Sequence, residues 1–143
     1  MTKKNPTSRR EARETAFQFL YANLPEGQIA ESVELKKSEF EAFCDSFAVP
    51  RDEFAWELAS GTGKNLPLLD EKLKLLSAHW RLERMPAVDR TVLRLGAYEI
   101  LLRPDIPKIV SINEAIEVVK RFGTGPESAS FINGILDKID KPS

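Results

Sequence analysis

The sequence contains very few of the side chains that build metal or nucleophile sites. Its 143 residues include a single cysteine, Cys44, and a single histidine, His79. One cysteine cannot form a disulfide within the chain, and a lone cysteine and histidine far apart in sequence make a poor metal or catalytic site. We therefore expect a non-enzyme of the reducing cytoplasm, with no bound metal or cofactor.

Long apolar runs and phosphate-binding glycine motifs are also missing. The longest apolar run is four residues, from Phe19 to Ala22, far too short to span a membrane. No apolar signal-peptide core follows the basic N-terminus. The stretch Gly61-Thr62-Gly63-Lys64 has neither the spacing nor the preceding strand of a phosphate loop. These absences predict no membrane segment and no nucleotide-binding loop.

Charge is distributed unevenly along the chain, although the net charge is only −1. The first thirteen residues contain five cations, which are Lys3, Lys4, Arg9, Arg10 and Arg13. Glu11 is the only acid among them, so this stretch carries +4 and the remaining residues carry −5. Residues 26–57 contain nine acids and three bases. A basic tip on an acidic body requires an explanation.

Turn and capping signals divide the chain into helices, and no segment alternates for long enough to predict a strand. Ser8 and Glu11 fit a capping box, so a first helix should begin at Ser8. Its buried stripe should comprise Ala12, Ala16, Phe19, Leu20 and Leu24. A second helix is predicted over 28–47, with Ile29, Val33, Phe40, Phe43 and Phe47 facing inward.

The remaining helices follow prolines, glycines and a second capping pattern. A third helix is expected after Pro50, although Gly61 and Gly63 weaken its pattern. A fourth is expected over about 66–78 and a fifth after Pro86. The helix after Pro86 is apolar on most of its circumference and should be central, with Arg90 and Arg94 on a narrow polar arc. Ser111 and Glu114 predict the start of a sixth helix, which Gly123 stops. A seventh, opened by residues 124–127, should bury Phe131, Ile132, Ile135, Leu136 and Ile139.

Arginines at the start of a helix are unfavourable for an isolated helix, because its N-terminus already carries partial positive charge. They become favourable when a polyanion binds, since backbone N–H groups and guanidiniums both donate to phosphate. Arg10 also lies near the azimuth of Tyr21 on the helix, and cations with an aromatic ring suit single-stranded RNA. The alternative is a solubilising basic tail. Phe131 is likewise either an exposed ring on which a base stacks or a residue of the hydrophobic core. Arg94 is either a phosphate contact or a solvated surface residue.

Three stretches in order carry a resemblance to a known family. They are RREARETAFQFLYA, MPAVDRTVLRLGAYEILLRPDIPKIVSINEAIEVVKRFG and FINGILDKI, and they resemble the NusB family of bacterial transcription antitermination proteins. Residues 26–80 resemble that family only in their helix pattern. The resemblance implies an all-α fold of about seven helices in two small packed subdomains. It implies one RNA-binding domain over 1–143, with a flexible basic arm at 1–7 and helical halves at about 8–80 and 84–140.

The same resemblance implies a non-catalytic RNA-binding function. Such proteins bind boxA-type single-stranded RNA of rRNA leader transcripts together with NusE, a small-subunit ribosomal protein. With NusA and NusG, the assembly helps RNA polymerase resist termination, including Rho-dependent termination. Two alternatives stay open: a helical protein-interaction module or homodimer, and a NusB-like domain separated from an rRNA methyltransferase. The chain has no glycine-rich cofactor loop or catalytic cysteine motif of a complete methyltransferase.

The resemblance also assigns site residues. RNA contacts are expected from Arg9, Arg10, Arg13, Tyr21, Arg94, Glu127 and Phe131, with Lys3 and Lys4 added on composition alone. Asp89 matches an acidic position that faces NusE. Ser130 departs from the basic residue that often precedes the phenylalanine, so one phosphate contact is missing and intrinsic RNA affinity should be lower. An extra residue in GTGPES leaves the Glu127 assignment open to a shift of one position.

Overall fold

Helices account for all the regular structure in the described part of the chain. The computed structural model describes residues 8–25, 31–77, 84–123 and 125–142. Within these ranges there are seven helices and no strand: α1 (Arg9–Asn23), α2 (Lys37–Ser46), α3 (Glu53–Lys64), α4 (Leu66–Leu76), α5 (Ala87–Leu102), α6 (Lys108–Phe122) and α7 (Pro126–Asp137). The predicted all-α fold is confirmed. None of these helices is both long and apolar enough to cross a bilayer.

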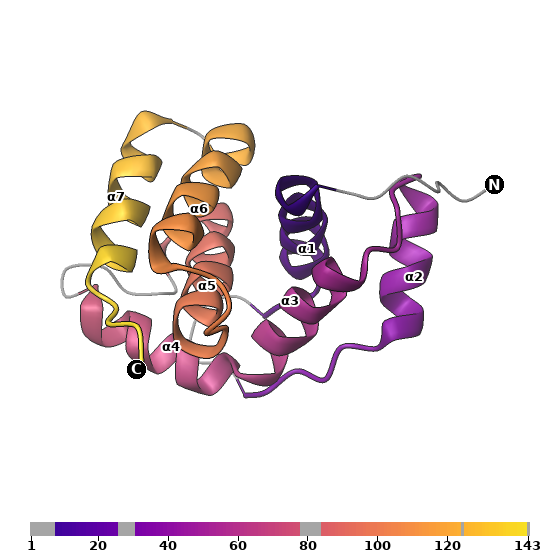
Figure 1. Ribbon diagram of the computed structural model, residues 1–143, viewed down its shortest axis with the longest axis horizontal. Coiled ribbons are helices and arrows are strands. Elements are labelled where there is room, and N and C mark those ends of the chain that lie inside the picture. Colours follow the sequence, from indigo (N-terminus) through magenta and orange to yellow (C-terminus); the bar gives the residue numbers. More distant parts are fainter. Residues whose placement is uncertain (1–7, 26–30, 78–83, 124, 143) are drawn as a thin grey trace.

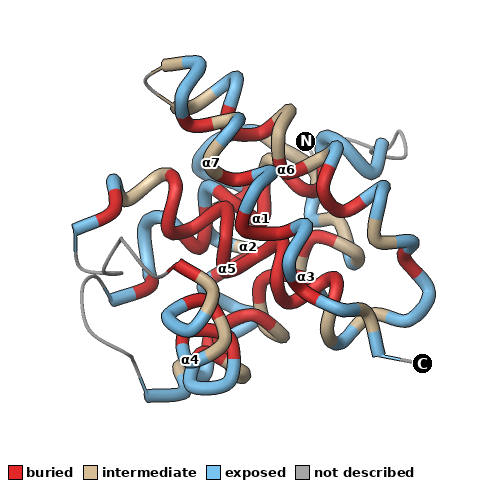
Figure 2. The backbone as a smooth tube through the Cα atoms, turned by 90° about the vertical axis from the view of Figure 1, so that its left-hand side faces the viewer, coloured by how far each residue is buried: buried red, intermediate tan, exposed pale blue. Residues whose placement is uncertain are grey.

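Helix α5 is the centre of the fold, as its apolar circumference predicts. Every residue from Asp89 to Ile100 is buried, and α1, α3, α4, α6 and α7 all pack against this helix (Figure 2). The predicted solvated arc is wrong, because Arg90 and Arg94 are buried with the rest. A helix surrounded on all sides has no face left for a solvated cation, so its arginines need partners inside the protein.

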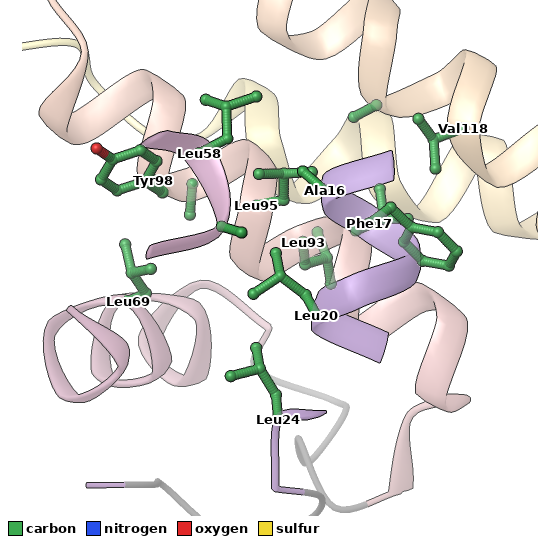
Figure 3. Packing of buried hydrophobic residues seen from close by; sticks show 14 of the residues in the cluster. Ala16, Phe17, Leu20, Leu24, Leu58, Leu69, Leu93, Leu95, Tyr98 and Val118 are labelled. Atoms are coloured by element: carbon green, nitrogen blue, oxygen red, sulfur yellow. The ribbon is translucent and has the colours of Figure 1, made fainter. Parts of the chain in front are cut away.

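Helix α1 begins and packs as its sequence predicts. The Ser8 side chain accepts a hydrogen bond from the Glu11 backbone, and the Glu11 carboxylate accepts one from the Ser8 backbone, which completes the capping box. All five residues of the predicted stripe are buried. Figure 3 shows Ala16, Leu20 and Leu24 among leucines of neighbouring helices. In Figure 1, α1 lies between α2 on one side and the α5–α6–α7 group on the other, and it packs against α2, α3, α5 and α6.

The second helix is shorter than predicted. Residues 31–36 are not helical, because they run along the end of α3: the Val33 backbone donates to the Gly63 carbonyl at 2.9 Å and the Ser32 hydroxyl to the Lys64 carbonyl at 2.7 Å. Phe47 is 64% exposed, so its predicted inward position is wrong. It follows the last residue of α2, and Ala48 then turns the chain with a φ of 54°. Ile29 lies outside the described residues.

Tertiary packing also explains two other differences from the predicted boundaries. Helix α3 continues through Gly61 and Gly63 to Lys64, and a Cβ at Gly61 would overlap the Tyr98 ring, so the glycine permits close packing of α3 on α5. The capping box predicted at Ser111 is wrong, because α6 begins at Lys108 after Pro107. The end of α6 at Gly123 and the start of α7 at Pro126 agree with the prediction.

Candidate nucleic-acid interface

The three arginines that begin α1 have three different environments. Arg9 is exposed, and its guanidinium lies 3.7 Å from the centroid of the Phe54 ring, a cation–π contact with α3. No carboxylate in the described part of the chain forms an ion pair with it, so its N–H donors remain available. Arg9 is therefore the arginine of this helix best placed to bind phosphate.

Arg10 is also at the surface, but its guanidinium is engaged. Its Nε and Nη2 atoms donate to the two oxygens of Glu114 on α6, at 3.1 and 3.0 Å. The Arg10 side chain is 54% exposed and that of Glu114 17%. Hydrogen bonds from Arg10 hold the pKa of the Glu114 carboxyl below its ordinary value. The cation thus faces solvent, with its counter-charge beneath it.

Arg13, which the resemblance assigns to phosphate, does not lie on the surface of the folded protein. The side chain is 4% exposed, and its Nε and Nη2 atoms donate to Glu99 of α5, both at 2.9 Å. The Ser111 hydroxyl donates to the same carboxylate at 2.9 Å. Arg9 and Arg13 lie one turn apart on the same side of α1, and both guanidiniums lie over the Phe54 ring. Arg13 is buried because α5 packs against this part of α1, whereas Arg9 lies at the exposed start of the helix.

Arg94, which the resemblance also assigns to RNA, is likewise buried in the folded protein. It is 1% exposed, and its Nε and Nη2 atoms each lie 2.8 Å from an oxygen of Asp70 on α4, which is also buried. Its Nη1 donates to the Pro25 carbonyl at 2.8 Å, just after α1. Arg90 is buried as well and donates to the Met85 carbonyl at 3.0 Å. These arginines hold helices and loops together.

An aromatic row runs from α1 to the end of α6. Tyr21 is 50% exposed and stacks on Phe17, with ring centroids 5.8 Å apart, and Phe17 stacks on Phe122 at 5.0 Å. The guanidinium of Arg121 lies 5.4 Å from the Phe122 centroid. Sequence reasoning missed Arg121 and Phe122. The basic end of α6, KRFG, was the only signal, and it does not show which helix lies opposite.

The first turns of α7 carry the next two predicted residues. Glu127 is exposed, and Phe131, one turn later, is partly buried and packs against the core. Ser130 and Gly134 are exposed beside Phe131, and no atom lies within 4 Å of a Cβ placed at Gly134. The phenylalanine thus belongs partly to the core and lies at the edge of an open surface.

Asp89, which the resemblance places against NusE, has a buried carboxylate in the folded protein. It is buried at the start of α5, and the Ser128 hydroxyl of α7 donates to it at 3.2 Å. Burial raises the pKa of this carboxyl, and the hydrogen bond from Ser128 opposes the rise. In this position Asp89 joins α5 to α7.

The other predicted features are outside the described residues or away from the surface. Lys3, Lys4 and the arm 1–7 lie outside the described residues, as does His79. Cys44 is buried. In the described ranges, no group of three or more histidine, cysteine or acidic side chains is placed to hold a metal ion.

Comparison with known proteins gives one consistent result. The NusB family profile matches residues 10–141. A transcription antitermination protein NusB of Desulfitobacterium hafniense (strain DSM 10664 / DCB-2) is 53% identical over 134 residues, which cover 92% of this chain and 87% of that protein. The solved T. maritima NusB superposes with a TM-score of 0.77 at 34% identity, and 96% of each chain is covered.

A second solved structure shares the fold at lower identity. It is described as antitermination factors NusB and NusE in complex with dsRNA, and it superposes with a TM-score of 0.72 at 22% identity, covering 90% of this chain and 92% of that one. Other curated relatives carry the same name of transcription antitermination protein NusB, among them one of Desulfatibacillum aliphaticivorans that is 46% identical over 134 residues, covering 92% of this chain and 88% of that protein. With a profile match over nearly its whole length and a relative that shares more than half of the aligned residues, the chain belongs to the NusB family.

Proposed function

We propose that this protein binds boxA-type single-stranded RNA of rRNA leader transcripts together with NusE. In complex with NusA, NusG and RNA polymerase, it would help transcription resist termination, including Rho-dependent termination. The observation that carries this proposal is the row of exposed cations and aromatic rings, exposed at Tyr21 and partly buried at Phe122, along α1 and the end of α6. We call this surface the α1–α6 row, and it consists of Arg9, Arg10, Arg121, Phe122 and Tyr21.

The α1–α6 row has the two components that single-stranded RNA requires. Guanidiniums bind phosphates, and exposed rings stack on bases. Arg10 and Tyr21 are eleven residues apart on one helix, or about 16 Å along its axis. A flexible strand laid along α1 would therefore meet cations first and a ring afterwards, and Phe131 on α7 offers a further ring.

Cooperation with NusE follows from the limited free charge of the row. Arg10 and Arg121 are held in ion pairs, and Arg13 is buried. This leaves few free phosphate donors, so the protein alone should bind RNA weakly. A second RNA-binding surface supplied by a docked partner raises the overall affinity through effective concentration. The solved NusB–NusE–RNA complex supports this arrangement for a protein of the same fold.

The test is RNA binding with and without NusE. Fluorescence anisotropy of a labelled boxA RNA, titrated with the full chain at several salt concentrations, should show weak binding alone and clearly tighter binding with cognate NusE. A scrambled RNA of equal length is the control for sequence preference. Equal affinity with and without NusE, or for both RNAs, would contradict the proposal. Sedimentation of the free protein distinguishes this function from a homodimer that covers the row.

A further inference from the structure

We propose that Glu14 and Glu114 compete with RNA phosphates for the guanidiniums of Arg121 and Arg10, and so restrain the RNA affinity of the isolated protein. This inference rests on the proposed function and adds a mechanism to it. Its physical basis is a pair of ion pairs between α1 and α6. Each helix supplies one cation and one carboxylate.

The two ion pairs follow one another along neighbouring helices, about one turn apart on α1 and about two turns apart on α6. Arg10 of α1 donates two hydrogen bonds to Glu114 of α6. One turn further along α1, Glu14 accepts from the Nη1 atom of Arg121, at 3.1 and 3.2 Å. The two helices pack against each other, and on each helix the residue that comes later in the sequence belongs to the second ion pair.

Both cations lie outermost and both carboxylates lie beneath them. The side chains of Arg10 and Arg121 are 54% and 64% exposed, whereas those of Glu114 and Glu14 are 17% and 18% exposed. A polyanion that approaches from solvent therefore meets the guanidiniums first. The carboxylates remain at the helix interface and neutralise the charge that the polyanion would otherwise meet.

Phosphate competes with the Glu114 carboxylate for the Nε–Nη2 edge of Arg10. A bidentate guanidinium–phosphate contact uses two parallel N–H donors, and the Nε–Nη2 edge of Arg10 is occupied by Glu114. Exposed ion pairs are weak, so a polyanion with several phosphates can displace them. Arg121, once released from Glu14, would still lie beside the Phe122 ring and next to the aromatic row.

Neutral variants of the two acids test this competition. In Glu14→Gln and Glu114→Gln, boxA RNA should bind about 3- to 10-fold more tightly at low salt. The slope of log K against log salt should steepen by up to about 0.7 for each additional phosphate that a released guanidinium binds. Glu39→Gln is the matched control, because it removes one negative charge from an exposed position on α2, away from the row. Thermal unfolding of each variant verifies that the fold is intact.

A double-mutant cycle adds a test whose expected result a change in net charge alone would not produce. Arg121→Gln should weaken RNA binding and abolish the gain that Glu14→Gln produces in the native background. If Glu14→Gln and Glu114→Gln bind like the native protein, or if Glu39→Gln gains as much, the competition is refuted while the proposed function stands. If neither the native protein nor any variant binds RNA, even with NusE, both proposals are refuted.

Discussion

Arg13 of α1 and Glu99 of α5 form a bidentate ion pair inside the protein, with both N–O distances at 2.9 Å. The side chains are 4% and 2% exposed, and the Ser111 hydroxyl of α6 donates to the same carboxylate. This pair therefore connects three helices. An arginine that the family resemblance assigns to RNA is part of the structural core, and its removal should affect folding before it affects binding.

Replacement of Arg13 by methionine should destabilise the fold, because it leaves the Glu99 charge buried without its cation. We expect a loss of about 3–5 kcal/mol in the free energy of unfolding, measured by urea denaturation. The double variant Arg13→Met with Glu99→Leu should recover much of that loss, since no buried charge remains. A loss below about 1 kcal/mol in the single variant would mean that the pair contributes little to stability.

Replacement of Arg9 and Arg10 by alanine should weaken RNA binding and leave the fold intact. Both side chains are exposed, so stability should change by less than about 1 kcal/mol. Binding to boxA RNA with NusE should fall, and the salt slope should decrease by up to about 0.7 for each phosphate that is no longer bound. Arg51→Ala is the control for loss of a surface cation, because Arg51 is exposed and paired with Asp45 of α2. Unchanged affinity and slope in the double variant would identify the basic tip as a solubilising tail.

Phe131→Leu separates stacking from packing at the edge of α7. Leucine keeps most of the apolar volume that Phe131 contributes to the core, so the unfolding free energy should fall by less than about 1.5 kcal/mol. It removes the aromatic ring, so RNA binding should weaken by about 1–3 kcal/mol if a base stacks there. Binding and urea denaturation are measured on the same preparation. A large loss of stability with unchanged RNA affinity would assign Phe131 to the core alone.

Cys44 should make the protein less stable in alkali. Burial raises the pKa of its thiol to about 11 from an ordinary value of 9.0. Below pH 9 the thiol is protonated in both the folded and the unfolded protein, so its full contribution to the free energy of unfolding is present. Between about pH 9 and 11 only the unfolded chain loses the proton, so stability should fall by up to about 3 kcal/mol.

The control for this alkaline effect is Cys44→Ala. Other groups also titrate in this range, so the difference between the native protein and Cys44→Ala isolates the thiol. The native thiol should also react slowly with a disulfide reagent until the protein unfolds. Rapid reaction under native conditions, or identical pH profiles for the two proteins, would contradict this burial effect.

Much of the local structure could be predicted because its causes are local. The Ser8–Glu11 capping box, the buried stripe of α1 and the proline and glycine boundaries of α7 and α6 depend on residues within a few positions of one another. The failures involve partners far away in sequence. Residues 31–36 are not helical because they bind the end of α3, and Ser111, which lies inside α6, donates its hydroxyl to Glu99 of α5.

The candidate site was predictable only in outline. Sequence showed that the start of α1 is basic and that Tyr21 follows on the same helix. It did not show that Arg121 and Phe122 lie beside them, since 107 positions separate Glu14 from Arg121. Nor did it show that Asp89 is covered by α7, where Ser128 hydrogen-bonds to it.

By itself, the sequence determined the helical class, the family resemblance and the uneven distribution of charge, because each depends on residue type and short-range spacing. Only the tertiary structure decided which arginines face solvent. A guanidinium carries the same charge in every sequence context, but its partner depends on what the fold brings near it. Glu99 lies 86 positions from Arg13, and Asp70 lies 24 from Arg94. Packing of α5 against α1 and α4 buried those two arginines with their carboxylates and left Arg9 at the surface, free to bind a polyanion.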